Sequence, residues 1–247
     1  MKTVNTKANT SNTWLTNRQQ GDIYTATADI IIVERQHTIR LLLNIFRYHF
    51  GDQKDLNILD LGCGDGSITK RFRDLYPDNT YYLLDGAAAM LDKARQKFEG
   101  ENVHFIQQTF EAYLALPPDD AKYSFIFSIN AIHHLDFLAK SQMYAKLYRE
   151  LQVGGLFVNI DVVLPSSERS EQWQFQMWVD WINQALHQKG VEEGFGKYDQ
   201  LPSHYKHKPE NKPSALFDQL DVLRKIGFRD VDCFYKYGIF AMFGGTK

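Results

Sequence analysis

A glycine-rich run carries the clearest chemical signal in the sequence. Residues 60–66 read DLGCGDG and lie between an apolar stretch and a helical pattern. Glycine lets the backbone turn sharply and lets a ligand come close to the main chain. The N-terminus of the following helix adds free N–H groups and a positive dipole end. The run therefore predicts a ligand-binding turn in preference to a turn that serves structure alone.

The spacing of these glycines separates the run from the pyrophosphate-binding turn of dinucleotide folds. That turn follows the pattern G-x-G-x-x-G, which would require a glycine at position 67, where this chain has Ser67. Here the third glycine comes one residue early, and an aspartate precedes it. A nicotinamide-dependent oxidoreductase is therefore disfavoured.

A second signal is the carboxylate of Asp85, which ends the next apolar run about twenty residues after the glycines. In doubly wound sheets, a carboxylate at this place can accept hydrogen bonds from both ribose hydroxyls of a nucleoside. An isolated aspartate here would more simply be a helix N-cap. Its combination with the glycine-rich run favours ribose binding.

The elements that must position these residues alternate along the chain. Short, nearly all-apolar strands that alternate with helices are typical of a parallel sheet covered on both faces. The expected strands are residues 57–61, 81–85, 103–106, 124–129 and 156–163, followed by two closing strands at 231–235 and 239–243 joined around Gly238. The expected helices are residues 24–50, 67–75, 87–98, 138–151 (stopped by residues 153–155) and 215–226.

The chain is expected to form a single domain over residues 13–247, preceded by a disordered leader at 1–12. Within that domain, residues 13–50 would form a helical cap and residues 165–213 a helical lid or substrate insertion. Trp173, Trp178 and Trp181 recur in the insertion at near-helical spacing. Such a stripe is more often core packing, and the alternatives are the apolar lid of a substrate pocket or a contact in a homodimer.

The composition restricts the partners. Lys and Arg number 28 against 30 Asp and Glu, so no global field attracts nucleic acid or acidic lipid. A basic, aromatic stretch at 204–208 is interpreted as solvated surface, with a phosphate or RNA contact as the alternative. No apolar run is long enough for a bilayer and no signal peptide is apparent, so a cytoplasmic protein without a membrane partner is expected. Two scattered cysteines, without a Cys-x-x-Cys pair, predict no metal site.

The glycine-rich run and Asp85, together with further motifs, resemble the class I S-adenosylmethionine-dependent methyltransferase superfamily. Residues 128–135 (SINAIHHL) are similar to the motif after the fourth strand of small-molecule methyltransferases. Residues 151–155 (LQVGG) resemble the L-x-P-G-G turn before their fifth strand, with Val153 replacing proline. The resemblance implies a Rossmann-like, doubly wound α/β fold with a mostly parallel seven-stranded sheet, an antiparallel C-terminal strand and a helical lid insertion. It also implies S-adenosylmethionine as cofactor and S-adenosylhomocysteine as product.

The resemblance assigns cofactor contacts to residues at the strand ends. Asp85 would bind the ribose, and Tyr24 would close over the cofactor. An acid usually follows the third strand in this superfamily, but Gln108 and Thr109 stand here, so one of them replaces it or adenine is held by stacking. The methionine end of the cofactor would be held by Asp60, Gly62, Cys63 and Gly64. The adenine pocket would be lined by Gly86, Met90 and Phe110. The sulfonium and the amino group would be faced by Ser128 and Ile129.

Three polar residues are candidates for the acceptor side of the site. His133, His134 and Asp161 follow or end strands, at the edge where open α/β sheets place ligands. Methyl transfer from a sulfonium needs a general base only if the nucleophile arrives protonated. His133 and Asp161 are the predicted catalytic residues. The alternative is that the histidines cap or pack the motif.

The motifs indicate a methyltransferase and leave its acceptor open. A small-molecule acceptor, methylated by in-line displacement, agrees with the aromatic insertion and the near-neutral charge. The alternatives are an enzyme that modifies tRNA or other RNA on the same fold, and a protein that binds the cofactor without turnover. A basic face would favour the RNA enzyme, and consumption of labelled cofactor would exclude the non-catalytic protein.

Overall fold

The computed structural model describes residues 27–98, 102–190, 200, 205 and 207–247. Within them, seven strands pair into one sheet in the order β3-β2-β1-β4-β5-β7-β6. Strands β1 to β5 run parallel, and β7 is antiparallel to both of its neighbours, β5 and β6. The predicted Rossmann-like, doubly wound fold with an antiparallel C-terminal strand is confirmed.

The bounds of the elements follow the predicted alternation closely. The strands are β1 Asn57–Leu61, β2 Thr80–Asp85, β3 Val103–Gln107, β4 Tyr123–Ile129, β5 Leu151–Val162, β6 Arg229–Tyr237 and β7 Phe240–Thr246. The helices are α2 Arg35–Phe50, α3 Ser67–Leu75, α4 Ala88–Arg95, α5 Phe110–Ala115, α6 Phe137–Glu150, α7 Glu168–Gln188 and α9 Leu216–Ile226, with a short 3-10 turn, η2, at Ile132–His134.

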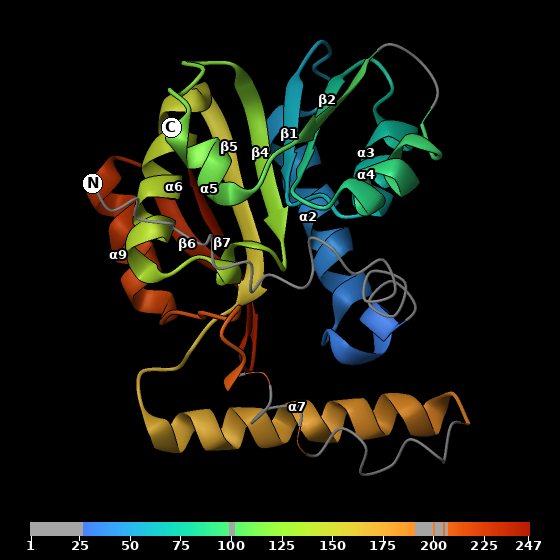
Figure 1. Cartoon of the computed structure of the whole chain (residues 1–247), viewed down its shortest axis with the longest axis vertical. Helices are drawn as coiled ribbons and strands as arrows, with labels where there is room; N and C mark the ends of the chain where they lie inside the picture. Colours follow the sequence, from blue (N-terminus) through green and yellow to red (C-terminus); the bar gives the residue numbers. More distant parts are fainter. Residues whose placement is uncertain (1–26, 99–101, 191–199, 201–204, 206) are drawn as a thin grey trace, which may run out of the picture.

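Helices cover both faces of the sheet, as nearly all-apolar strands require (Figure 1). On one face, α2, α3 and α4 pack against the strands around the fully buried Phe46 and Phe72. On the other face, α5, α6 and α9 pack around Tyr144 and Leu223. These two clusters fix the positions of the strand ends on which the site is built.

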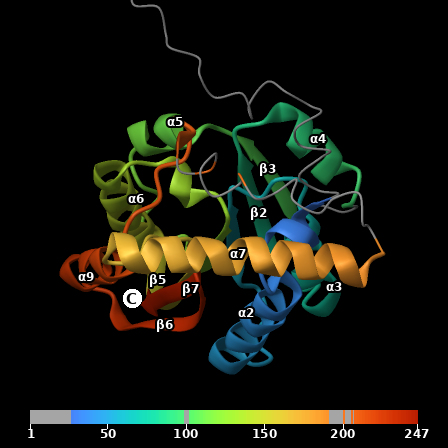
Figure 2. The ribbon, with the colours of Figure 1, turned by 90° about the horizontal axis from the view of Figure 1, so that it is seen from below.

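A third cluster lies outside the two layers and involves α7. Figure 1 shows α7 beyond the end of the sheet toward which the β4 and β5 arrows point, and Figure 2, from that side, shows it crossing in front of the strands. Trp178 and Ile182 of α7 pack against Ile32 and Phe240, and the Trp178 Nε1 donates to the carbonyl of Ile31 at 2.7 Å. Trp178 is therefore a core residue, as the more common interpretation of the stripe predicts, whereas Trp173 is 61% exposed.

The N-terminal helix is shorter than the expected one. Residues 27–31 are helical, residues 32–34 form a turn, and α2 begins at Arg35 after Glu34, whose φ is 50°. The turn places the buried Ile32 and Val33 against α7. A continuous helix over 24–50 was therefore the wrong expectation, because packing against α7 overrides helical periodicity there. Tyr24 and the expected leader at 1–12 lie outside the described residues.

Two further elements differ from expectation. Strand β5 begins at Leu151, directly after α6, so residues 153–155 lie inside a strand instead of stopping a helix. Its pairing with β4 is irregular near Tyr123 and Phe125, and Gly155 lies where a Cβ would come within 2.9 Å of the Ser124 carbonyl. Helix α5 was not expected, because six residues are too few to show a helical period.

The helices of the described ranges are all too short or too polar to cross a membrane.

Candidate functional site

The glycine-rich run forms a tight turn between β1 and α3. Gly62, Gly64 and Gly66 all have positive φ, at 79°, 55° and 71°, a conformation that residues with a Cβ rarely adopt. At Gly62 a Cβ would lie 2.4 Å from the Cβ of Ala131, so the turn passes directly against the segment that follows β4. The helix α3 begins at Ser67, as predicted, with its positive end at this turn.

The carboxylate of Asp85 is tied to the turn. Its Oδ2 accepts the N–H of Gly64 and its Oδ1 accepts the N–H of Ala87, both at 2.8 Å. Burial raises the pKa of this carboxyl, and the two N–H groups act in the opposite direction. Each carboxylate oxygen has a further lone pair, so Asp85 can hold the turn and still accept ribose hydroxyls.

Asp60 is the second carboxylate beneath the turn. It is 3% exposed and accepts the Thr69 hydroxyl at 2.6 Å. Burial raises its pKa to about 7, and the hydrogen bond from Thr69 partly opposes that shift. A cation close to this carboxylate would be favoured, because the ionised form has no counter-charge among the residues that the structure describes.

This raised pKa predicts a pH dependence of ligand binding. If the ammonium of the methionine end binds ionised Asp60, protonation competes with the ligand, and the Kd for S-adenosylhomocysteine should rise about tenfold from pH 8 to pH 6. Titration calorimetry at pH 6, 7 and 8 measures this. The Asp60→Asn variant should bind more weakly at pH 8 and lose most of the pH dependence. A wild-type Kd that is flat over this range would contradict the role of Asp60.

The residues predicted around adenine lie beside the turn. A Cβ added at Gly64 would lie 3.4 Å from the methyl carbon of Met90. A Cβ added at Gly62 would lie 3.3 Å from the ring of Phe110. The backbone N–H of Gln108 donates to the carbonyl of Asp85 at 3.1 Å, which joins the ends of β2 and β3. Thr109 uses its hydroxyl to cap α5 by accepting the N–H of Ala112 at 3.2 Å. Gln108 and the Phe110 ring are therefore the better adenine candidates.

Gly86 and Cys63 complete the predicted cofactor contacts on this side. Gly86 connects Asp85 to Ala87, the residue whose N–H holds the Asp85 carboxylate. Cys63 is buried in the turn, and burial raises the pKa of its thiol well above the usual value. A thiol of this kind contributes its backbone and its volume, because the reactive thiolate is disfavoured.

The end of β4 is tied to β1 through Ser128. This side chain is fully buried and donates its hydroxyl to the carbonyl of Leu61 at 2.7 Å. Ile129 and Asn130 are the half-buried residues at this end. Asn130 has a φ of 51°, and its buried Nδ2 has no hydrogen-bond partner among the residues that the structure describes. Asn130 is thus a site candidate that the sequence did not single out.

His133 and Asp161 form a buried pair across the ends of β4 and β5. The His133 Nδ1 lies 2.6 Å from one carboxylate oxygen of Asp161, and the His133 backbone N–H donates to the other at 2.8 Å. Burial raises the pKa of Asp161, but the interactions with His133 and with the N–H of Val162 lower it by more. The net shift of the pKa is therefore downward. An ionised carboxylate can only accept, so Nδ1 carries the proton and Nε2 is the basic nitrogen.

Residues far along the chain surround this pair. The backbone N–H of Lys212 donates to the His133 carbonyl at 2.8 Å, and the His134 Nδ1 lies 2.9 Å from the Glu210 carbonyl. Burial lowers the pKa of His134 to about 4, so this ring is neutral and structural. The Tyr205 ring lies 5.9 Å from the His133 ring, and its buried hydroxyl has no partner in the described part of the chain. Tyr205 belongs to the stretch at 204–208 that is interpreted from sequence as solvated surface, but its hydroxyl is buried and its ring packs against the cluster of α7.

The buried cation of this region is Lys140 on α6. Its Nζ contacts the Lys212 carbonyl and the Ser214 hydroxyl, and burial lowers its pKa to about 8. Lys140 thereby holds residues 212–214, which precede α9, next to His133. Of the basic stretch at 204–208, residues 204 and 206 lie outside the described residues.

Comparison with known proteins agrees with this geometry. Residues 58–155 match the family described as a methyltransferase domain. Malonyl-[acyl-carrier protein] O-methyltransferase 1 of Ilyobacter polytropus is 31% identical over 106 residues, which are 42% of this chain and 37% of that relative. Carboxy-S-adenosyl-L-methionine synthase of Staphylococcus epidermidis is 21% identical over 193 residues, 76% of this chain and 78% of that relative.

A solved structure shows the same fold. Human N-acetylserotonin methyltransferase in complex with S-adenosylmethionine superposes with a TM-score of 0.55 at 16% identity, over 93% of this chain and 54% of that chain. The sheet order, the glycine turn, the carboxylate at the end of β2 and the matched domain agree with one another. Residues 58–155 are thus a methyltransferase domain, and the chain is similar to the class I S-adenosylmethionine-dependent methyltransferases.

Proposed function

We propose that the protein transfers the methyl group of S-adenosylmethionine to a small-molecule acceptor that carries a protonated nucleophile. The observation that carries this proposal is the buried His133–Asp161 pair, because a base held in one tautomer is useful when the acceptor must lose a proton. Hydroxyl, amine and acidic carbon acceptors meet this description. A carboxylate acceptor, which arrives ionised, does not require such a base.

The described residues fit the cofactor. Gly62 lets the turn pack directly against Ala131, and a Cβ at Gly64 would meet only the Met90 methyl among the described residues. Asp85 retains acceptor capacity for two hydroxyls, and Asp60 offers a desolvated carboxylate to a cationic ligand. The cofactor supplies a methyl group already activated on a positively charged sulfur.

The chain contributes positioning and a proton acceptor. His133 Nε2 would take the proton of the nucleophile, and Asp161 would stabilise the imidazolium that results. Trp178 of helix α7 has its ring centroid 5.6 Å from that of Tyr205, a residue beyond the helix. Together they would form the wall that excludes water from the acceptor. On this basis we propose that the described part of residues 165–213 serves as the lid of a single domain.

A screen with methyl-labelled cofactor tests the proposal. Wild-type protein incubated with fractionated metabolite extracts should produce labelled small molecules and S-adenosylhomocysteine, identified by mass spectrometry. Label in tRNA would favour the RNA-modifying alternative. A carboxylated cofactor in place of S-adenosylhomocysteine would favour the activity named for the Staphylococcus relative. Binding without any turnover would favour a non-catalytic protein.

Replacing His133 with glutamine separates a base from a packing residue. We expect kcat to fall about 100-fold, because general-base catalysis contributes about this much. The Kd for S-adenosylhomocysteine should remain within a factor of about two. His104→Gln is the matched control, since His104 is exposed and stacks on Tyr82. A His133→Gln variant with wild-type kcat would show that His133 only packs the motif.

A further inference from the structure

The hydroxyl of Tyr205 is a buried polar group that the proposed reaction does not use. It has no hydrogen-bond partner among the residues that the structure describes. Its ring centroid lies 5.9 Å from that of His133 and 5.6 Å from that of Trp178. A buried donor without a partner is costly, and a ligand oxygen that accepts from it would remove that cost.

We infer that Tyr205 recognises the methyl acceptor: its hydroxyl donates a hydrogen bond to an oxygen of the acceptor, while His133 takes the proton from the nucleophile of the same molecule. This inference rests on the proposed function, because it assumes that the acceptor binds at His133. It narrows the substrate class to flat, aromatic compounds that carry a protonated nucleophile and, besides it, an oxygen that accepts a hydrogen bond.

The neighbouring carboxylate keeps the Tyr205 hydroxyl a donor and is not its partner. Burial raises the pKa of Tyr205 well above the usual value, and the charge of Asp161 raises it further, so the hydroxyl stays protonated. The Asp161 oxygens already have other donors. One faces the His133 Nδ1 and the N–H of Val162, and the other accepts the backbone N–H of His133. The Tyr205 proton therefore remains available to a bound molecule.

Contacts of the surrounding chain fix Tyr205 beside His133. Asn211 Nδ2 donates to the carbonyl of Tyr205 at 3.0 Å. The next residue, Lys212, donates its backbone N–H to the carbonyl of His133 at 2.8 Å, and its own carbonyl contacts the Nζ of Lys140. A polar group anchored in this way can select a ligand by the position of a single oxygen.

The rings around Tyr205 favour a flat acceptor. The Tyr205 and Trp178 rings meet edge to face at an interplanar angle of 86°, and Trp178 meets Phe240 at 76°. The His133 ring is tilted by 53° against that of Tyr205. Aromatic side chains in such arrangements offer faces and edges to a further ring. An acceptor bound at His133 would therefore meet aromatic surface and two polar atoms, which fix its orientation.

The first test compares two probes that differ in one oxygen. 3′-Hydroxyacetophenone carries a phenol and a carbonyl group, and 3-ethylphenol has a similar outline without the carbonyl oxygen. In ligand-observed NMR titrations of wild-type protein saturated with S-adenosylhomocysteine, the Kd for 3′-hydroxyacetophenone should be about 3- to 10-fold lower, the range of a neutral hydrogen bond. Tyr205→Phe should bind both probes with Kd values within about twofold of each other and should keep the wild-type Kd for S-adenosylhomocysteine.

A stability measurement separates recognition from a structural hydrogen bond. Removing a hydroxyl that has no partner leaves no other group unpaired, so Tyr205→Phe without acceptor should keep the wild-type Tm or exceed it. The matched control is Tyr81→Phe, because the fully buried Tyr81 of β2 donates its hydroxyl to the carbonyl of Tyr76 at 2.7 Å. This control should lower the Tm by about 2–4 °C and leave the preference between the two probes unchanged.

The outcomes separate this inference from the proposed function. Equal Kd values for the two probes on wild-type protein, or a preference that persists in Tyr205→Phe, overturn the assignment of Tyr205. A Tm that falls as far in Tyr205→Phe as in Tyr81→Phe shows a structural partner and overturns it as well. If wild-type protein methylates metabolites but binds neither probe, the aromatic class is wrong and the proposed function stands. Wild-type protein that binds S-adenosylhomocysteine and methylates no small molecule overturns the proposed function, and this inference with it.

Discussion

Replacing Asp85 with alanine is expected to weaken binding of S-adenosylhomocysteine by at least about 100-fold. The carboxylate holds the N–H groups of Gly64 and Ala87 and is the predicted acceptor for the ribose hydroxyls. A hydrogen bond to a charged group contributes about 1.5–3 kcal/mol, so the loss of two ribose contacts alone accounts for that factor. Titration calorimetry with the folded variant measures it.

Two further variants show what the loss at Asp85 means. Asp85→Asn retains an acceptor oxygen for one backbone N–H, so it should keep more affinity than the alanine variant. Asp92→Ala, on α4, removes an exposed carboxylate that pairs with Arg95 at 2.7 Å, and it should leave the Kd unchanged. If Asp85→Ala binds S-adenosylhomocysteine within fivefold of wild type, the ribose assignment is wrong.

Gly62→Ala should damage folding and binding together. A Cβ at this position would lie 2.4 Å from the Cβ of Ala131, and the residue has a φ of 79°. The left-handed conformation costs an L-residue about 1–2 kcal/mol, and overpacking adds about 1–3 kcal/mol. We expect the free energy of unfolding to fall by about 3 kcal/mol, which lowers the Tm by roughly 6–12 °C. Binding of S-adenosylhomocysteine should be lost in calorimetry.

A double variant divides this loss into its two causes. In Gly62→Ala/Ala131→Gly the close pair of Cβ atoms is absent, and the backbone strain at residue 62 remains. Denaturant unfolding should therefore show part of the stability restored relative to Gly62→Ala, a favourable coupling between the two positions. Strictly additive effects would show that the contact between the turn and residue 131 contributes nothing to the damage.

The features that were predictable from sequence are those determined by local patterns. The helix α3 has the predicted bounds because the glycines before it adopt positive φ and leave Ser67 as its first residue. Asp85 reaches the turn because it ends the strand paired directly with β1, so the sheet register brings Asp60 and Leu61 beside Leu83 and Leu84. Spacing along the chain is enough to imply both.

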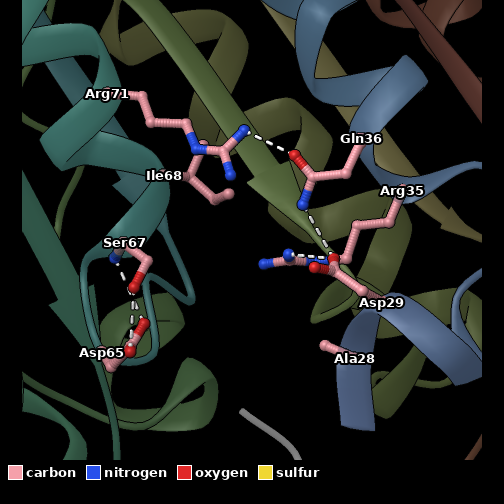
Figure 3. A pocket seen from close by; sticks show the side chains of 8 residues that line it. All are labelled: Ala28, Asp29, Arg35, Gln36, Asp65, Ser67, Ile68 and Arg71. Carbon is pink, nitrogen blue, oxygen red and sulfur yellow. Dashed lines mark hydrogen bonds and ion pairs between the residues drawn. The ribbon is translucent and has the colours of Figure 1, made fainter. Parts of the chain in front are cut away.

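The features that were missed depend on contacts between distant segments. Ser128 faces Leu61 because the pairing of β4 with β1 decides which side chains turn inward, and that register is not visible in an apolar run. Arg35 and Asp65 line one cleft (Figure 3) although they lie thirty residues apart, and Tyr205 reaches His133 from about seventy residues later. No periodicity within either segment encodes its distant partner.

The separate cluster of α7 has a consequence for how the molecule opens. Most of its apolar contacts are with residues 28–33 and with the first residues of β7, whereas the sheet is held by two other clusters. Regions of a protein unfold locally at a free energy set by their own contacts. We therefore expect helix α7 to open locally at a lower free energy than the sheet, which would show as faster amide hydrogen exchange in α7 than in β1 and β4.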